Sequence, residues 1–180
     1  VMVQTVPDIG VIVNCYATVS DLRDVDAADL LGRVPVPPNP ALLSACIHHK
    51  VVMVTGAGGS IGSELCRQIL QLGPVRLLLL EMSELALYSI ERELRAIVEN
   101  EGMHVELVAL LGNAHHRNRV REVLQTYGVQ TIYHAAAYKH VPIVEQNVFQ
   151  GIHNNVFSTW HAAEAALECN VETFILISTD

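Results

Sequence analysis

Hydrophobic residues from Lys50 onward fall into short continuous runs separated by longer amphipathic segments. Five of these runs predict buried strands, at residues 51–55, 76–81, 105–110, 129–133 and 173–178. Between the strands, apolar residues recur at helical spacing, and they predict helices around Ile61, Leu65, Ile69 and Leu72, around Leu87, Ile90, Leu94 and Ile97, around Val120, Val123, Leu124 and Tyr127, and over residues 147–168. Strands that are apolar on both faces and alternate with helices are typical of a parallel sheet covered on both sides. The predicted fold class is α/β, a Rossmann-type doubly wound parallel sheet truncated after its fifth strand.

The first 49 residues follow a different pattern and are interpreted as the tail of a preceding domain plus a proline-rich linker. Residues 1–13 end in a possible strand of that domain, and residues 32–40 hold four prolines, which fix φ and remove N–H donors. Asn39 can cap a short helix that has Pro40 at its first position. Residues 50–180 are then the Rossmann domain, incomplete at its C-terminal end.

Composition narrows the function classes. The formal net charge is −8 with the acidic residues dispersed, so on average the surface attracts neither nucleic acid nor an anionic membrane. The apolar runs are far shorter than a membrane span, and no signal peptide opens the chain, which is therefore expected to be soluble. Four scattered cysteines are typical of a reducing cytosol. The nine histidines show no zinc-ligand spacing, so no metal is predicted.

A glycine-rich turn follows the first strand of the repeated pattern. Gly56, Gly59 and Gly62 have the spacing GxxGxxG between a strand and a helix. The first glycine permits a tight turn, the second allows close approach of a diphosphate, and the third allows the helix to pack on the strand. The helix N-terminus at Ser60 and Ile61 offers free N–H groups and a positive dipole end to phosphates. These features predict a dinucleotide site, although an ordinary strand-to-helix turn would use the same residues.

Two polar positions at neighbouring strand ends refine the expected ligand. Glu81 ends the second strand, where its carboxylate can accept both ribose hydroxyls of an adenosine and repel a 2′-phosphate. NAD is therefore preferred over NADP; the alternative for Glu81 is a solvated cap to the next helix. Asn113 and Ala114 follow the third strand and are placed to meet the adenine edge, although Asn113 is equally suited to forming a turn.

Several motifs between residues 29 and 180 resemble those of the UDP-N-acetylglucosamine 4,6-dehydratases, polysaccharide-biosynthesis members of the extended short-chain dehydrogenases. They are Asp-Leu-Leu-Gly-Arg at 29–33, Thr-Gly-Ala-Gly-Gly-Ser-Ile-Gly at 55–62 followed by Ser-Glu-Leu, His-Ala-Ala-Ala-Tyr-Lys-His-Val-Pro at 134–142, Asn154-Asn155 with Ala-Ala-Glu-Ala-Ala at 162–166, and Ile-Ser-Thr-Asp at 177–180. Many relatives share the glycine turn, whereas the 134–142 motif joined to the terminal Ser-Thr-Asp is far more specific to this family.

The resemblance implies that NAD oxidises C4 of a UDP-sugar, that water is lost across C5 and C6, and that a 4-keto-6-deoxy sugar is formed. By position it implies cofactor contacts at Ala135, Ala136, Ala137 and Tyr138, a supporting role for Asn155, and substrate contacts at Lys139 and His140. It further implies that Asp180 is the acid that assists departure of the C6 hydroxyl and that Thr179 contacts the sugar near C4. The alternative interpretations without a functional role are tight packing for the alanines, a surface lysine for Lys139, and a chain-end carboxylate for Asp180.

The chain also departs from the family pattern. Asn113 stands where an acidic residue is frequent, and the lysine, the Tyr- or Met-xxx-Lys motif and the substrate-binding lobe that follow the aspartate in the family lie beyond residue 180. We therefore expect the isolated chain to bind NAD weakly and to turn over little. A nucleotide-sugar 4-epimerase or reductase, and a non-catalytic NAD-binding module, are the alternatives. Membership would also imply a homo-oligomer on the cytoplasmic side of the cell membrane, attached only through a missing N-terminal region.

Overall fold

The computed structural model describes residues 4–5, 23–24, 37 and 39–178 of the chain, which divides into two units, Val1–Pro38 and Asn39–Asp180. In the first unit, strand β1 (Gln4–Thr5) pairs antiparallel with strand β2 (Arg23–Asp24). The end of the range 1–13, where a strand is expected, and most of the proline-rich stretch lie outside the described residues. Thr179 and Asp180 lie outside them as well.

A five-stranded sheet forms the centre of the second unit. Its strands are β3 (Val51–Thr55), β4 (Arg76–Glu81), β5 (Glu106–Leu111), β6 (Thr131–His134) and β7 (Thr173–Leu176). They are all parallel in the order β5-β4-β3-β6-β7, which confirms the predicted fold class. The chain winds outward from β3 to one edge, returns, and continues from β6 to the other edge. The switch between β3 and β6 opens a crevice at the carboxyl ends of these two strands.

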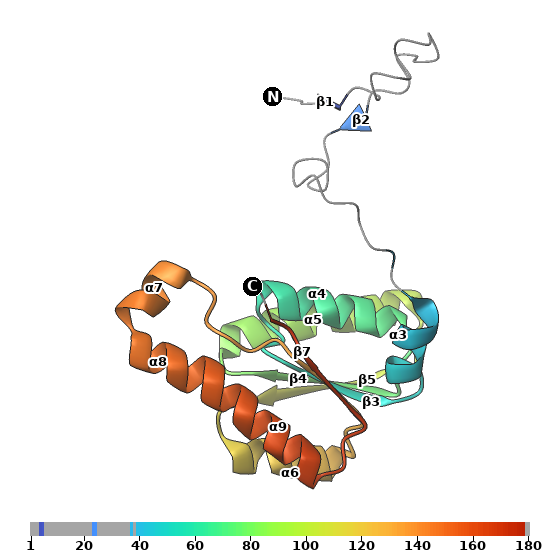
Figure 1. Cartoon of the computed structure of the whole chain (residues 1–180). Coiled ribbons are helices and arrows are strands. Elements are labelled where there is room, and N and C mark those ends of the chain that lie inside the picture. The colour runs from blue at the N-terminus through green and yellow to red at the C-terminus, as the bar shows by residue number, and fades with distance from the viewer. Residues whose placement is uncertain (1–3, 6–22, 25–36, 38, 179–180) are drawn as a thin grey trace. The chain divides into compact units, whose positions relative to one another are not determined.

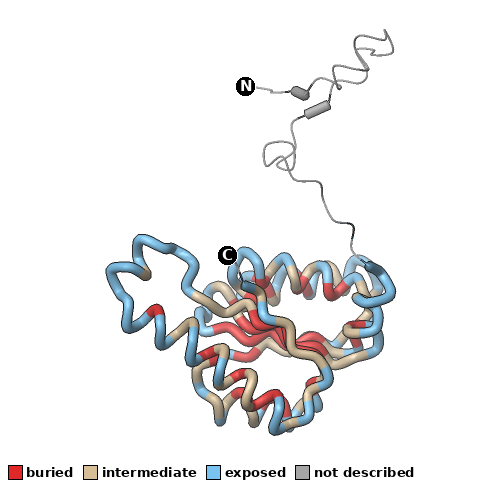
Figure 2. Tube along the Cα trace, in the orientation of Figure 1, coloured by how far each residue is buried: buried red, intermediate tan, exposed pale blue. Residues whose placement is uncertain are grey.

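Helices cover both faces of the sheet (Figure 1). On one side lie α3 (Pro40–Ile47), α4 (Ser60–Gln71) and α5 (Glu84–Glu101); on the other lie α6 (Arg117–Tyr127) and α9 (Ser158–Glu168). Alternate residues of one strand serve the two layers: Val52 and Val54 pack in the core beneath α4 and α5, whereas Met53 packs against α6 and α9. Figure 2 shows the central strands β3, β4 and β6 as the most continuously buried part of the unit, as expected for strands apolar on both faces, whereas the edge strands β5 and β7 are partly exposed.

The core-facing stripe of α4 agrees with the predicted one except at Ile61, since Ile69 is buried and Leu65 and Leu72 pack against the core. Gly62, Cys66, Ile69 and Leu70 are buried, whereas Ile61 is exposed at the helix start. A stripe that begins at Gly62 lets the helix approach the turn before it, and it rotates Ile61 away from the core. Ile61 therefore does not belong to the core-facing set in which its spacing had placed it.

The helix predicted over residues 147–168 is present as an unbroken run of α8 (Val148–Ile152), the π-helix η2 (His153–Phe157) and α9. A short helix that the sequence did not predict, α7 (Val141–Gln146), comes before it. Asn147, with φ −130° and ψ 50°, separates α7 from α8. A π-helix inserts a residue into the helical repeat without ending the helix, so apolar spacing alone does not reveal it, and such insertions are frequent at functional sites.

Helix α3 belongs to the unit that contains the sheet. Asn39 caps it as predicted, since its Oδ1 accepts hydrogen bonds from the N–H groups of Ala41 at 3.1 Å and Leu42 at 3.3 Å. Ile47 is 1% exposed in the core, and the Thr131 hydroxyl donates to the Cys46 carbonyl at 2.6 Å. The compact unit thus begins at Asn39, and it includes a helix that a boundary at residue 50 leaves outside. Within residues 39–178, none of the helices has both the length and the apolar character that crossing a membrane requires.

Candidate functional site

Two of the three spaced glycines, Gly56 and Gly62, lie so close to other backbone atoms that neither position has room for a side chain. Gly56 has a φ of +67° and donates its N–H to the Leu80 carbonyl at 2.8 Å, and a Cβ at this position would lie 2.8 Å from the Ala136 Cα. A Cβ on Gly62 would lie 1.9 Å from the Gly56 carbonyl oxygen. A Cβ on Gly59 would meet nothing closer than 3.4 Å. The first and third glycines therefore permit the turn and the close approach of the helix, which packs against the turn itself, while the second faces open space.

A fourth glycine, which the GxxGxxG spacing does not include, is equally constrained. A Cβ on Gly58 would lie 2.6 Å from the Cβ of Ala86, in the first turn of α5. The pair brings α5 against the glycine turn. The adjacent glycine in Gly58-Gly59 was a visible signal, but its partner Ala86 could be found only once the helix position was known.

The N-terminus of α4 points its first N–H groups toward the space above the turn. Gly59 is the N-cap and has no side chain to occupy them, so the N–H groups of Ser60, Ile61 and Gly62 stay available to an acceptor. Together with the positive end of the helix dipole, they provide the local attraction for an anion that the net charge of the chain does not.

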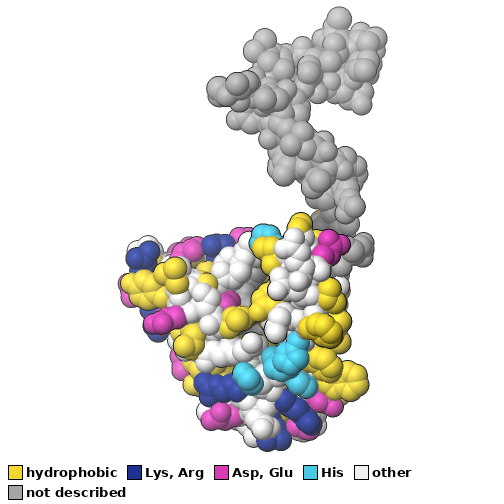
Figure 3. Space-filling view, turned by 90° about the vertical axis from the view of Figure 1, so that its left-hand side faces the viewer, with side chains coloured by type: hydrophobic (Ala, Val, Ile, Leu, Met, Phe, Trp, Pro, Cys, Tyr) yellow, Lys and Arg dark blue, Asp and Glu magenta, His cyan; other side chains and the backbone are white. Residues whose placement is uncertain are grey.

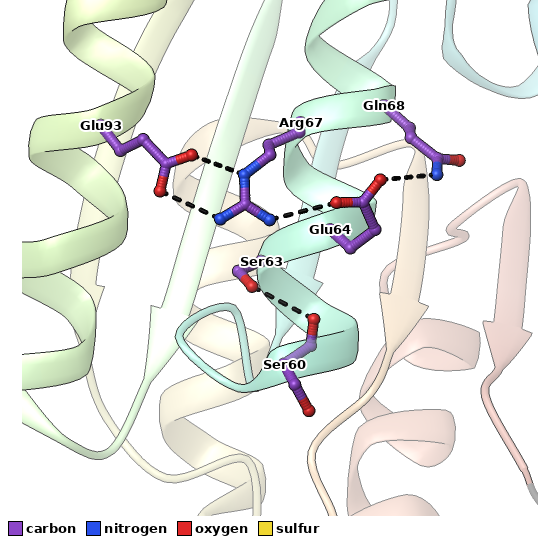
Figure 4. A network of polar contacts seen from close by, with 6 residues as sticks. All are labelled: Ser60, Ser63, Glu64, Arg67, Gln68 and Glu93. Carbon is purple, nitrogen blue, oxygen red and sulfur yellow. Dashed lines mark hydrogen bonds and ion pairs between the residues drawn. The ribbon is translucent and has the colours of Figure 1, made fainter. Parts of the chain in front are cut away.

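Helix α4 is held against α5 by a network of charged side chains (Figure 4). The Arg67 guanidinium donates to both carboxylate oxygens of Glu93, at 2.5 and 3.0 Å, and to Glu64 at 3.1 Å. These bonds raise the pKa of Arg67, and the hydrogen bond from Arg67 lowers the pKa of the Glu93 carboxyl. This partly exposed fork links the two helices whose first turns border the glycine turn.

The carboxylate of Glu81 lies beside the turn, only 8% exposed. Its Oε2 accepts from the Gly58 N–H at 3.0 Å, and its Oε1 accepts from the N–H groups of Met82 at 2.8 Å and Ser83 at 3.0 Å. A carboxylate has about four acceptor positions. One position, on Oε2, therefore stays open, where the sequence predicts contacts to two ribose hydroxyls.

Two cavities meet over the glycine turn. A smaller one of about 250 Å³ is bordered by Glu81, Met82, Asn113, Ala114, Ala136 and Asn154, and a larger one of about 600 Å³ by Ser60, Ile61, Lys139, His140, Asn147 and Gln150. Both share Gly56, Gly59, Ala135, Ala137 and Tyr138 as lining residues. With the exception of Asn155, the described residues expected to contact a cofactor or a substrate thus border two cavities that share five lining residues. Asn154, Asn147 and Gln150 were not predicted, because only the π-helix and the break at Asn147 bring them there.

The segment Ala135–His140 is fixed from behind by Asn155. The Asn155 Oδ1 accepts from the Tyr138 N–H at 2.8 Å, and its Nδ2 donates to the Tyr138 carbonyl at 3.0 Å. Asn155 borders neither cavity, so its place is that of a support for the lining segment. Ala136 serves both of its proposed purposes, because it packs on Gly56 and lines the smaller cavity.

Asn113 also has both of the roles considered for it, forming a turn and lining a cavity. Its Oδ1 accepts from the His115 N–H at 2.9 Å and so forms the turn that leads to α6, while the residue lines the smaller cavity beside Ala114.

Histidine side chains gather on the face beyond this turn (Figure 3). The ring centroid of His115 lies 3.9 Å from that of His153 and 5.0 Å from that of His161, although His115 is distant in sequence from the other two. Burial and the neighbouring histidines lower the pKa of His115. Among the described residues, no three or more His, Cys, Asp or Glu side chains are arranged to hold a metal ion.

A buried polar group beneath the cavities was not singled out from the sequence. Thr55, His134 and Ser158 end β3, end β6 and begin α9, and they meet through the imidazole of His134. Thr55 and His134 carried a possible signal, since a polar residue at the end of an apolar strand marks the crevice of such sheets. Ser158 gave none, because its contact depends on the π-helix.

A parallel sheet with a glycine turn at its switch point defines a Rossmann-type domain. The chain belongs to the polysaccharide biosynthesis protein family, whose profile matches residues 52–180. It is 40% identical over 174 residues to the capsular polysaccharide biosynthesis protein CapD of Staphylococcus aureus, and 42% identical over 163 residues to the probable polysaccharide biosynthesis protein EpsC of Bacillus subtilis. These stretches cover 97% and 91% of this chain but only 28% and 27% of the relatives, so the chain spans little more than a quarter of their length.

Solved structures share the fold. Pen from Bacillus thuringiensis superposes with a TM-score of 0.64 at 24% identity, over 73% of this chain and 39% of that protein. DesIV from Streptomyces venezuelae, a dTDP-glucose 4,6-dehydratase solved with NAD and TYD bound, superposes with a TM-score of 0.54 at 22% identity, over 68% of this chain and 37% of that protein. At these identities the likeness establishes the architecture.

Proposed function

We propose that this chain is the cofactor-binding part of an NAD-dependent nucleotide-sugar 4,6-dehydratase, which converts UDP-N-acetylglucosamine to a 4-keto-6-deoxy sugar nucleotide for surface polysaccharide synthesis. The observation that carries the proposal is the pair of cavities that meet over the glycine turn, with a buried carboxylate at one end and the Tyr138–His140 segment at the other. The family and the fold shared with a dehydratase solved with NAD support it.

The smaller cavity suits the adenosine half of the dinucleotide. The open acceptor position on Glu81 can take a ribose hydroxyl, and the Asn113 side chain keeps a donor for the adenine edge. No lysine or arginine is among the described residues that line this cavity, so a 2′-phosphate there would meet the Glu81 carboxylate without a compensating cation. These features favour NAD over NADP.

The diphosphate belongs at the start of α4. The N–H groups of Ser60, Ile61 and Gly62 can donate to it, and the lack of a Cβ on Gly59 leaves room for its oxygens. The larger cavity then receives the nicotinamide and the sugar nucleotide. Lys139 and His140 border it, and the ammonium of Lys139 is suited to the charge of a UDP diphosphate.

Bound NAD would supply a reversible oxidation at C4 of the sugar, and the protein would supply the proton transfers. A C4 ketone makes the C5 proton acidic, so that elimination of the C6 hydroxyl comes within reach of ordinary acid and base groups. By resemblance, Asp180 is the acid for that hydroxyl and Thr179 contacts the sugar. In the sequence these two residues come three and four positions after Leu176, the last residue of β7.

A 4-epimerase is the second candidate. The chain is 27% identical over 131 residues to a UDP-glucose 4-epimerase of Rickettsia rickettsii, which is 73% of this chain and 37% of that protein. Both enzymes would use the same cofactor cavities, and they differ in whether oxygen at C6 is lost. The product therefore separates them.

The test uses the protein as its gene encodes it, with UDP-N-acetylglucosamine and NAD, and follows the sugar by NMR. Loss of the C6 oxygen with a new C4 ketone is the result expected. A C4 epimer as the only product would replace the dehydratase by the epimerase, and NAD binding without any change of the sugar would favour a non-catalytic module.

Glu81→Gln keeps the size of the carboxylate and removes its charge. The amide oxygen can still accept from the N–H groups of Met82 and Ser83, whereas the NH2 group replaces the oxygen that accepts from Gly58 and faces the open position. We expect NAD to bind about tenfold more weakly and the preference over NADP to shrink. An unchanged ratio of the two affinities would contradict the role given to Glu81.

Assembly and location extend the same proposal. We propose a homo-oligomer attached to the cytoplasmic side of the cell membrane. An archaeal relative that is 34% identical over 131 residues is an uncharacterized membrane protein of Methanocaldococcus jannaschii, which supports the membrane part. Light scattering and membrane fractionation of the gene-encoded protein test the two parts separately.

A further inference from the structure

Three polar side chains meet in the interior directly beneath the two cavities. Thr55, His134 and Ser158 are 0%, 1% and 1% exposed. The Thr55 Oγ1 lies 2.8 Å from the His134 Nδ1, and the Ser158 Oγ lies 3.4 Å from the His134 Nε2. Buried polar groups destabilise a fold unless they are hydrogen-bonded. Here both ring nitrogens have a partner, each from a different element.

The His134 ring acts in its neutral form. Burial, with a smaller contribution from the nearby Lys139 ammonium, lowers the pKa of His134 to about 4. A neutral imidazole has one donor and one acceptor nitrogen, and a hydroxyl can serve as partner to either. The ring is also closed off from solvent, and it lines neither cavity. It is therefore placed to connect segments of the protein, not to exchange protons with a ligand.

Each member of the group adjoins a segment of the candidate site. Thr55 immediately precedes Gly56, and His134 immediately precedes Ala135. Ser158 follows the π-helix from which Asn155 holds Tyr138. The backbone adds two connections: the Thr55 carbonyl accepts from the Ala135 N–H at 3.1 Å, and the His134 carbonyl accepts from the Ile177 N–H at 3.0 Å.

We propose that His134 is a positioning residue, whose two ring nitrogens hold the glycine turn, the Ala135–Tyr138 segment and the π-helix in the arrangement that binds the dinucleotide. It reaches the ligand only through these segments. The inference rests on the proposed function for its ligand, whereas the arrangement of the segments can be measured without any ligand. An apolar side chain could fill the space of the ring beside Phe174, which stacks on it at 5.9 Å between centroids, but it could not form the two hydrogen bonds.

The test compares His134→Leu, which keeps the bulk and removes both hydrogen bonds, with His134→Asn and His134→Gln. An asparagine amide can reach the Thr55 hydroxyl from the position of Nδ1, and a glutamine amide can reach toward Ser158 from the position of Nε2. Val123→Ala is the matched control, because Val123 on α6 is 1% exposed in the core and borders neither cavity. Its truncation destabilises the domain and leaves the hydrogen bonds of His134 with Thr55 and Ser158 in place.

Two readouts on the gene-encoded protein decide the matter. Calorimetric titration with NAD should show the affinity of His134→Leu reduced about tenfold or more, with at least partial rescue in one amide variant and native affinity in Val123→Ala. Amide hydrogen exchange without ligand should be faster at Ala135 and Ile177 in His134→Leu than in Val123→Ala, once each rate is corrected for global stability.

Equal corrected exchange rates in His134→Leu and Val123→Ala would overturn the positioning role whatever the affinities are. Equal losses of affinity in those two variants would overturn it too, since the effect would then follow from stability alone. Absence of NAD binding by the unaltered protein would instead refute the proposed function, and the exchange rates would still decide whether His134 positions these segments.

Discussion

The substitution Gly62→Ala tests the close packing on which the glycine turn depends. The added Cβ would lie 1.9 Å from the Gly56 carbonyl oxygen and 3.1 Å from the Ala57 Cα, and both are backbone atoms that cannot rotate away. The start of α4 must therefore move by more than an ångström to restore an ordinary contact, since ordinary contacts of a Cβ begin near 3.4 Å. Overpacking of this kind costs about 1–3 kcal/mol. It also displaces the N–H groups that we assign to the diphosphate.

Two other glycines supply matched controls for Gly62→Ala. A Cβ on Gly59 meets nothing closer than 3.4 Å, so Gly59→Ala should change the free energy of unfolding by less than about 1 kcal/mol but place a methyl group in both cavities. Gly102 ends α5 at φ +62° with open space around it and borders neither cavity, so Gly102→Ala should cost about 1 kcal/mol of stability without affecting NAD.

Urea unfolding and calorimetric titration with NAD separate the three variants. We expect Gly62→Ala to lower the urea midpoint by about 1 M and to weaken NAD binding, Gly59→Ala to weaken binding only, and Gly102→Ala to lower stability only. A Gly62→Ala protein that unfolds at the native midpoint and binds NAD as the native protein does would refute the packing argument.

Further predictions concern the buried histidine, the asparagine support and the first helix. The folded-state pKa of His134, about 4, lies below its ordinary value of 6.5, so the folded protein binds fewer protons between these values. Its contribution to stability is complete above about pH 6.5 and is lost as the pH falls toward 4, by about 3 kcal/mol. Urea unfolding at pH 7 and 4.5 should therefore show a larger loss of stability for the native protein than for His134→Leu. Parallel pH dependences of the two proteins would contradict this prediction. Asn155→Ala removes both bonds to the Tyr138 backbone and should weaken NAD binding about tenfold in a calorimetric titration, with a smaller loss in Asn155→Asp, which can still accept from the Tyr138 N–H; native affinity in both would contradict the supporting role. Asn39→Ala removes the cap of α3 and should lower the free energy of unfolding by about 1 kcal/mol with unchanged NAD affinity; a larger change in affinity than in stability would be inconsistent with its distance from the cavities.

The sheet could be predicted from the sequence because its signal is local. Arg76–Glu81 forms the strand that its apolar run predicts, and the five runs alternate with helices as a parallel sheet requires. The signal for the start of α3 was equally local, because Asn39 caps the helix and Pro40 is its first residue. The spacing of apolar residues could not determine the rotation of α4 about its axis. Ile61 is exposed because Gly62 is the residue of the first turn that faces the core.

The candidate site was predictable where a single residue type is required by backbone geometry. Gly56 and Gly62 are examples, since no side chain fits at either position. It was not predictable where two distant segments must first be brought together. The pairing of Gly58 with Ala86, and the bridge from Thr55 through His134 to Ser158, depend on tertiary placement, and the bridge further depends on a π-helix that apolar spacing does not encode.

An NMR titration with NAD, observed through backbone amide resonances, tests the central claim most directly. If the dinucleotide lies across the glycine turn with its diphosphate at the start of α4, the largest shifts will fall on the amides of Gly59, Ser60, Ile61 and Gly62, with further shifts at Asn113 and over Ala135–Tyr138. Saturating NAD that leaves the four turn amides unmoved, or that shifts a different face of the domain, would contradict the account.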